Sequence, residues 1–158
     1  MGRPFLKMNG LGNDFVVVET RSAPFAPTRE EVRAIADRAN GVGCDQLIAI
    51  DKADGADARV RFWNADGEEV GACGNGTRCV GWLLMQSAGK DEVALETQAG
   101  RLVATRAGDR LVSVFPRQGH YALDPANADE MRRAAAAERE LFEGVIALEG
   151  SISGEHGI

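Results

Sequence analysis

The most informative stretch of the sequence is GACGNGTRCVGWLLM, which runs from Gly71 to Met85. A cysteine stands among small residues near its start, glycine and asparagine follow, and the chain then turns apolar. Glycine lets the backbone turn tightly, whereas a segment that is apolar nearly all round is typical of a buried helix. We therefore predict a central helix that starts near Gly76, with Cys73 in the glycine turn before it.

Alternating apolar residues on both sides of this helix predict strands. The first two span residues 3–8 and 14–20, around the turn NGLGN, and two more follow at residues 45–50 and 58–63. After the helix, the segments EVALET, GRLVATR and RLVSVF alternate between turns, as in an antiparallel meander. These elements predict an α+β fold in which a curved, mostly antiparallel sheet surrounds a central apolar helix.

A further helix is predicted over residues 26–41 by signals at both of its ends. Thr28 suits the N-cap, Glu31 completes a capping box, and Gly41 suits the end of the helix. From residue 116 the sequence pattern changes. It predicts a loop and then a long, Ala-rich and charged helix over residues 126–150. We therefore predict an N-terminal lobe over residues 1–115 and a helical appendage over residues 116–158.

Composition argues against several function classes. The formal net charge of −6 and the pI of about 5.0 disfavour a nucleic-acid partner, because proteins that bind nucleic acids present basic surfaces. Three cysteines, an odd number without C-x-x-C spacing, indicate a reducing compartment and no metal site. The apolar runs are too short to span a bilayer, so we predict a cytoplasmic protein without a membrane partner.

Cys73 is the candidate for reactive chemistry. The unpaired N–H groups in the first turn of a helix favour anions, so they lower the pKa of a thiol beside them and can also hold a carboxylate. Gly74 and Gly76 let the backbone approach a ligand without a Cβ in the way. A lone cysteine is more often a small buried apolar residue, and we assign that role to Cys44 and Cys79.

Four segments of the chain resemble the diaminopimelate epimerase family. They are KMNGLGNDFVVVE at residues 7–19, GVGCDQLIAI at 41–50, FWNADGEEV at 62–70 and ACGNGTRC at 72–79, in the order and spacing of the family. The resemblance covers residues 3 to about 112. It implies an isomerase of lysine and cell-wall precursor synthesis that works without pyridoxal phosphate or another cofactor. In that family two cysteines face opposite sides of the substrate α-carbon, and proton removal by one and delivery by the other convert LL-diaminopimelate to the meso form.

The same resemblance implies roles for individual residues. Cys73 corresponds to one of the two catalytic cysteines. Gly74 and Asn75 would hold the α-carboxylate and the α-amino end of the substrate. Further contacts with the substrate are implied at Asn13, Gln46 and Asn64.

Local structural roles remain open for these three amides when the residues are considered alone. Asn13 could cap its own turn, Asn64 could close the NADG turn, and Gln46 could be an ordinary residue at a strand edge. Asp14 and Arg78 are expected to be structural, the first by satisfying turn amides and the second by anchoring the cysteine loop.

The resemblance stops where the family continues into a second lobe, which carries the second cysteine. Here residues 120–158 instead resemble the C-terminal part of FAD-linked 2-hydroxyacid dehydrogenases of the glycolate-oxidase and D-lactate-dehydrogenase type. Glu155 and His156 match a Gly-Glu-His-Gly turn of those enzymes, and we expect no function for His156 without partner ligands. These observations suggest a junction of two unrelated segments near residues 110–118, and an epimerase site that is incomplete.

Three rival functions stay open at this point. The lobe could bind an amino acid without chemistry, or it could be a proline or hydroxyproline racemase of the same fold. The tail alone suggests a flavin oxidoreductase, although the sequence has no glycine loop of the dinucleotide-binding type. An amino-acid substrate is the expected partner, and the apolar face that the lobe presents to its missing counterpart predicts self-association, with a homodimer as one form.

Overall fold

The computed structural model of the chain describes residues 3–107, 111–116 and 132. The chain divides into two units, Met1–Arg117 and Gln118–Ile158, and nearly all of the described residues belong to the first. The helix predicted over residues 126–150, together with Glu155 and His156, lies outside the described residues apart from Arg132. Within the described part of the chain, no helix is long and apolar enough to cross a membrane.

The described residues of the first unit form two helices and eight strands. The helices are α1 (Arg29–Ala36) and α2 (Gly74–Ala88). The strands are β1 (Leu6–Gly10), β2 (Asn13–Glu19), β3 (Gln46–Asp51), β4 (Ala58–Asn64), β5 (Glu69–Val70), β6 (Glu92–Thr97), β7 (Gly100–Ala107) and β8 (Leu111–Pro116). Every predicted strand is present, and the two-residue strand β5 is an element that the sequence pattern did not reveal.

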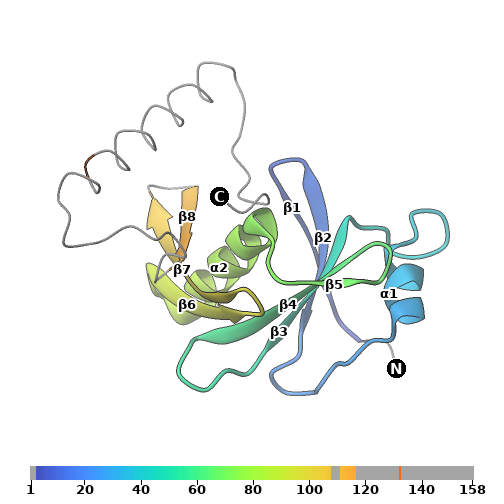
Figure 1. Ribbon diagram of the computed structural model, residues 1–158, viewed down its shortest axis with the longest axis horizontal. Coiled ribbons are helices and arrows are strands. Elements are labelled where there is room, and N and C mark those ends of the chain that lie inside the picture. Colours follow the sequence, from blue (N-terminus) through green and yellow to red (C-terminus); the bar gives the residue numbers. More distant parts are fainter. Residues whose placement is uncertain (1–2, 108–110, 117–131, 133–158) are drawn as a thin grey trace, which may run out of the picture. The chain divides into compact units, whose positions relative to one another are not determined.

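All eight strands form one mixed sheet in the order β1-β2-β3-β4-β6-β7-β8, with β5 paired to β4. The pairs β2–β3 and β4–β6 are parallel, and the other pairs are antiparallel. Helix α2 packs against both β1 and β8, the first and last strands of this path, so the sheet curls around it (Figure 1). The predicted α+β fold, with a curved and mostly antiparallel sheet around an apolar helix, is therefore confirmed.

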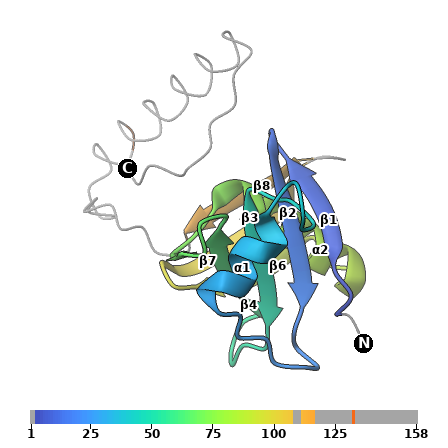
Figure 2. The same cartoon turned by 90° about the vertical axis from the view of Figure 1, so that its right-hand side faces the viewer.

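Two apolar clusters cover the two faces of the sheet, because side chains alternate between faces along each strand. The α2 face is filled by Phe15, Val17, Ile48, Ile50, Ala58, Val60, Phe62, Cys73, Cys79, Val80, Leu84, Met85, Val93, Leu95 and Ala104. The α1 face is filled by Val16, Val18, Val32, Ala36, Cys44, Leu47, Ala49 and Trp63. Helices α1 and α2 thus lie on opposite faces of the sheet (Figure 2).

The start of α1 agrees with the prediction, and its end does not. Thr28 is the N-cap, and it forms the predicted capping box with Glu31. The helix ends at Ala36, five residues before Gly41, because the Asp37 carboxylate accepts the backbone N–H groups of Ala39 and Asn40. The chain then folds back and donates to the last carbonyls of the helix, so a turn replaces the predicted final turn of α1.

The start of α2 also differs from the prediction. The helix begins at Gly74 rather than near Gly76, and Cys73 is its N-cap. The Cys73 sulfur accepts the Gly76 N–H at 3.3 Å, and the backbone carbonyl of Cys73 accepts the Thr77 N–H at 2.8 Å. Cys73 therefore belongs to the helix terminus itself, where a cap usually has a hydroxyl or carboxylate oxygen.

The hairpin of β1 and β2 turns more tightly than predicted. The turn consists of Leu11 and Gly12 alone, with φ angles of 50° and 91°. Two successive positive φ values suit a tight hairpin connection, and glycine adopts them without strain. The tight turn extends β1 to Gly10 and starts β2 at Asn13, which places Asn13 in the sheet.

Candidate functional site

Three side-chain amides lie at terminal positions of three neighbouring strands, on the face of the sheet that α2 covers. Asn13 precedes Phe15 by two residues in β2, Gln46 precedes Ile48 in β3, and Asn64 follows Phe62 in β4. The three apolar residues belong to the core cluster on the α2 face. Since side chains two residues apart share a face, the amides continue these apolar rows beyond the core.

Gln46 and Asn64 are direct cross-strand neighbours. They are paired in the antiparallel register of β3 and β4, and Gln46 Nε2 donates to Asn64 Oδ1 at 2.8 Å. The NADG turn is closed by backbone atoms, since the Gly67 N–H donates to the Asn64 carbonyl at 2.8 Å. The Asn64 side chain is thus directed to Gln46, whose Oε1 is buried without a hydrogen-bond partner among the described residues.

Asn13 joins the sheet to the first turn of α2. Its Nδ2 donates to Asp45 Oδ2 at 3.2 Å, and its Oδ1 accepts from Asn75 Nδ2 at 2.8 Å. In the described part of the chain these partners lie outside the hairpin turn of Asn13, so its amide connects distant segments. Asn75 is 3% exposed, and its Oδ1 has no partner among the described residues.

Cys73 and the first turn of α2 lie directly against the sheet. The Cys73 side chain is 1% exposed and belongs to the core cluster on the α2 face. A Cβ on Gly76 would lie 2.9 Å from Ile48 Cδ1 and 3.0 Å from Phe62 Cε1. Glycine therefore permits the close approach of the helix terminus to β3 and β4, and this approach brings Asn75 within reach of Asn13.

A charged cluster supports the segments that carry the amides. Asp14 pairs with Arg38 and with Lys7, each at 2.7 Å, and its Oδ1 also accepts the Asp45 N–H. Arg38 first, and Lys7 second, hold the pKa of the Asp14 carboxyl well below its usual range. Asp14 and Asp45 thus tie the start of β2 to the segment before β3.

The other two cysteines lie in the cores, where they were expected. Cys44 is buried on the α1 face of the sheet, and Cys79 is buried within α2. Burial raises the pKa of both thiols above its ordinary value. All three cysteines are buried thiols in the described part of the chain, and only Cys73 lies at a helix terminus.

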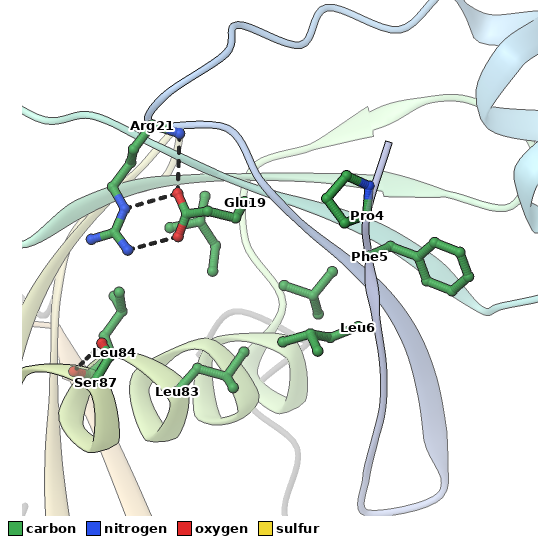
Figure 3. A pocket seen from close by; sticks show the side chains of 10 residues that line it. Pro4, Phe5, Leu6, Glu19, Arg21, Leu83, Leu84 and Ser87 are labelled. Carbon is green, nitrogen blue, oxygen red and sulfur yellow. Dashed lines mark hydrogen bonds and ion pairs between the residues drawn. The ribbon is translucent and has the colours of Figure 1, made fainter. Parts of the chain in front are cut away.

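A cavity of about 280 Å³ lies away from these residues. It is lined by apolar side chains that include Leu6 of β1 and Leu83 and Leu84 of α2, together with the Glu19–Arg21 ion pair (Figure 3). These helix residues follow Cys73 by more than two turns, and none of the predicted site residues lines the cavity. Among the described residues, no group of three or more His, Cys, Asp or Glu side chains could hold a metal ion.

The structure thus brings Asn13 to Asn75 and Gln46 to Asn64, while Gly74 and Asn75 form the first turn of α2 beside Cys73. Asp45, which contacts Asn13, was not among the predicted site residues. Its position directly before Gln46 in the segment GVGCDQLIAI was the available signal.

Comparison with known proteins separates two parts of the chain. A family model described as diaminopimelate epimerase matches residues 5–121, and one described as FAD linked oxidases, C-terminal domain, matches residues 119–158. Diaminopimelate epimerase from Phenylobacterium zucineum (strain HLK1) is 86% identical over 114 residues, which are 72% of this chain and 41% of that protein. The enzyme of the same name from Caulobacter sp. (strain K31) is 67% identical over 122 residues, with 72% and 42% of the two chains covered. The chain therefore spans about two fifths of the length of these curated relatives.

Similarity to solved structures concerns the fold. A crystal structure of a phenazine biosynthesis protein of the PhzF family from Enterococcus faecalis matches with a TM-score of 0.53 and 18% sequence identity. The match covers 68% of this chain and 42% of that chain. At this identity the similarity shows a shared α+β fold, which agrees with the curled sheet around α2.

Proposed function

The chain belongs to the diaminopimelate epimerase family, and from this premise we propose that its first unit forms one half of an amino-acid epimerase site. The proposed reaction converts LL-diaminopimelate to the meso form without a cofactor. The observation that carries the proposal is the position of Cys73 as the N-cap of α2, with its sulfur 3.3 Å from the Gly76 nitrogen.

Cys73 supplies the base in this proposal. A helix N-terminus favours the thiolate over the thiol, and a thiolate is the form that can accept a proton. The Cys73 sulfur takes the α-proton of the substrate, and the electron pair of the broken C–H bond remains on the α-carbon and its carboxylate. A thiol on the opposite face then donates a proton to the α-carbon, and in the family this thiol belongs to the second lobe.

The first turn of α2 would stabilise the carboxylate during this step. The N–H groups of Gly74 and Asn75 have no intrahelical acceptor, as at the start of any α-helix. Donors fixed in advance where negative charge develops lower the barrier to α-proton removal. Gly74 also lacks a side chain that would keep a carboxylate from these donors.

The remaining amides would orient the substrate. Asn13, Gln46 and Asn64 lie at the ends of three neighbouring strands, on the same face as α2. The buried oxygens of Gln46 and Asn75 are acceptors that a donor such as an ammonium group could satisfy. This donor set supports an amino acid as the substrate class.

Hydrogen exchange at the α-carbon tests the proposal. The reduced chain is incubated with LL-diaminopimelate in D₂O, and the loss of the α-proton signal is followed by NMR. We expect exchange that disappears in Cys73→Ala and persists in Cys44→Ala, since Cys44 lies on the other face of the sheet. Exchange that is absent from the folded chain, or equal in Cys73→Ala, would contradict the assignment of Cys73 as the base.

A second candidate is a lobe that binds an amino acid without changing it. It is favoured by the positions of Cys44 and Cys79, which lie in the cores and leave one cysteine at the helix terminus in the described part of the chain. Under this alternative, diaminopimelate raises the melting temperature of the chain while its α-proton signal stays constant.

We also propose that the chain joins two unrelated segments, a lobe over residues 1–115 and a tail over residues 116–158. The matches of two different family models, which meet near residue 120, support this proposal, as does the tail's resemblance to FAD-linked oxidases. Long-read sequencing of the native locus, together with the intact mass of the expressed protein, tests it. An uninterrupted native frame with a matching mass would exclude an assembly artefact as the source of the junction.

Self-association of the lobe is a further part of the proposal. Large apolar side chains are exposed at Phe5, Leu6 and Trp82, by 47%, 52% and 43% respectively. Exposed apolar groups favour association in water, and a second copy of the lobe is the partner present in any purified sample. Light scattering should report dimers or larger soluble species, and a monodisperse monomer would contradict this expectation.

A further inference from the structure

The side-chain amide of Asn75 has two contrasting environments. Its Nδ2 donates to Asn13 Oδ1 at 2.8 Å, whereas its Oδ1 is buried without a partner among the described residues. A buried acceptor without a partner is destabilising, so this orientation of the amide requires a physical cause. Turning the amide over would not relieve it, because Asn75 Oδ1 would then face Asn13 Oδ1, another acceptor.

The cause lies at the next member of the hydrogen-bond chain, Asp45. Its Oδ2 is 3.2 Å from Asn13 Nδ2, and a carboxylate can only accept hydrogen bonds. Asn13 must therefore turn its nitrogen toward Asp45, which leaves its oxygen for Asn75. The direction of both amides follows from the charge at position 45.

Asp45 is itself held firmly in place. Its Oδ1 accepts from Arg38 at 2.8 Å, and its Oδ2 also accepts the Asp14 N–H at 3.0 Å. The carboxylate thus has a fixed position relative to β2, where Asn13 begins the strand. Because the group at this end of the hydrogen-bond chain can only accept, the chain from Asp45 through Asn13 to Asn75 has a single direction.

We propose that Asp45 is a positioning residue for the first turn of α2, acting through Asn13 to hold Asn75 in one amide orientation. Asn75 is the second residue of α2, so its anchored side chain also fixes the backbone donors of that turn. The inference rests on the proposed function, in which these donors bind a carboxylate. Without the carboxylate at position 45, Asn13 can present either amide atom, and Asn75 follows it into two orientations.

The direction of the chain can be measured in the unmodified protein without any ligand. Scalar couplings across hydrogen bonds, recorded on the ¹⁵N,¹³C-labelled full chain, identify which nitrogen donates to which carbonyl group. We expect a coupling from Asn75 Nδ2 to Asn13 Cγ and one from Asn13 Nδ2 to Asp45 Cγ. A coupling from Asn13 Nδ2 to Asn75 Cγ, or none between these residues, would overturn the proposal.

Two variants separate the role of Asp45 in this chain from its ion pair with Arg38. Asp45→Ala removes the acceptor of Asn13, whereas the matched Arg38→Gln removes the ion pair and keeps that acceptor. We expect two sets of Asn75 side-chain amide signals in Asp45→Ala and one set in Arg38→Gln. One set in a folded Asp45→Ala, or two sets in both variants, would overturn the proposal.

A double substitution tests the proposal if Asp45→Ala does not fold. Asp45→Asn combined with Asn13→Asp moves the carboxylate one step along the chain, where it can accept from both neighbouring amides. We expect the single set of Asn75 signals to return, with its coupling now to the carboxylate carbon at position 13. Two sets in this double variant would contradict the proposed cause of the orientation.

The α-proton exchange assay gives the functional readout. Misplacement of about 1 Å can lower a rate by about 100-fold, so exchange by Asp45→Ala should fall between about tenfold and that limit, and Arg38→Gln should stay within about twofold of the unmodified chain. Equal losses in both variants would overturn the positioning role. If the unmodified chain shows no exchange, the proposed function fails, whereas the couplings still decide the direction of the amide chain.

Discussion

Gly76 and Phe62 approach each other so closely that a Cβ on residue 76 would lie 3.0 Å from Phe62 Cε1. This contact sets the distance between the first turn of α2 and the sheet strand that ends in Asn64. The positions of Cys73, Asn75 and the strand-end amides therefore depend on the absence of a side chain at residue 76.

Gly76→Ala should destabilise the lobe despite the better helix propensity of alanine. Overpacking a filled core costs about 1–3 kcal/mol, against a gain of about 1 kcal/mol for alanine over glycine within a helix. We expect a net loss of about 1 kcal/mol in the free energy of unfolding, measured by urea denaturation. Gln86→Ala, at an exposed position of α2, should change the free energy of unfolding by less than about 0.5 kcal/mol. An unfolding free energy of Gly76→Ala equal to that of the unmodified chain would show that the core rearranges to hold the added methyl group.

The capping box at the start of α1 should behave as a coupled pair. Thr28 Oγ1 accepts the Glu31 N–H at 3.2 Å, and the Glu31 carboxylate accepts the Thr28 N–H at 2.8 Å. We expect Thr28→Ala to lower the free energy of unfolding by about 1 kcal/mol. Since both hydrogen bonds hold the same first turn of α1, Thr28→Ala with Glu31→Ala should cost less than the sum of the single changes. Strict additivity would show that the two hydrogen bonds are independent.

Asp14 should give the lobe a stability that depends on pH. Arg38 and Lys7 hold the pKa of its carboxyl below the usual range in the folded state, whereas in the unfolded chain that pKa is about 4. The folded state therefore binds the proton less readily, and the contribution is fully present above about pH 5 and is lost as the pH falls below about 4. Removal of the Asp14 carboxylate should therefore lower the free energy of unfolding most near neutral pH.

Asp14→Asn tests this dependence through urea denaturation at a series of pH values. The difference in unfolding free energy between the unmodified chain and this variant should be largest near pH 7 and should shrink as the pH falls below about 4. Asp54→Asn, at an exposed loop position, serves as the matched control and should show little difference across the range. A difference for Asp14→Asn that stays constant with pH would contradict an ionic origin.

Local signals in the sequence predicted the local structure where one interaction dominates. The start of α1 follows from Thr28 and Glu31, which need only each other. The end of α1 was missed because the Asp37 side chain competes with the helix for backbone N–H groups. The start of α2 was missed because a cysteine sulfur serves as the cap, a role that propensity scales assign to oxygen-bearing side chains.

The candidate site was predicted as a set of residues and not as an arrangement. The family resemblance pointed to Asn13 and Asn75, which are 62 positions apart, but no local pattern shows that their amides meet. Asp45 went unnoticed because its role depends on the register of β2 and β3 and on which amide atom faces it. Hydrogen-bond direction is a property of the folded chain, and the sequence carries no local record of it.

Substitutions at Cys73 should separate its structural role from its proposed chemical role. Serine is a better N-cap than cysteine and retains an acceptor for the Gly76 N–H, whereas alanine leaves that buried donor without a partner. We expect the free energy of unfolding of Cys73→Ser to lie within about 1 kcal/mol of that of the unmodified chain. That of Cys73→Ala should be about 1 kcal/mol lower than that of Cys73→Ser. Both variants should lose α-proton exchange, because a hydroxyl at neutral pH is a far weaker base than a thiolate. Retained exchange in the folded Cys73→Ser chain would mean that another group removes the proton, and equal stabilities of the two variants would mean that the sulfur contributes nothing as a cap.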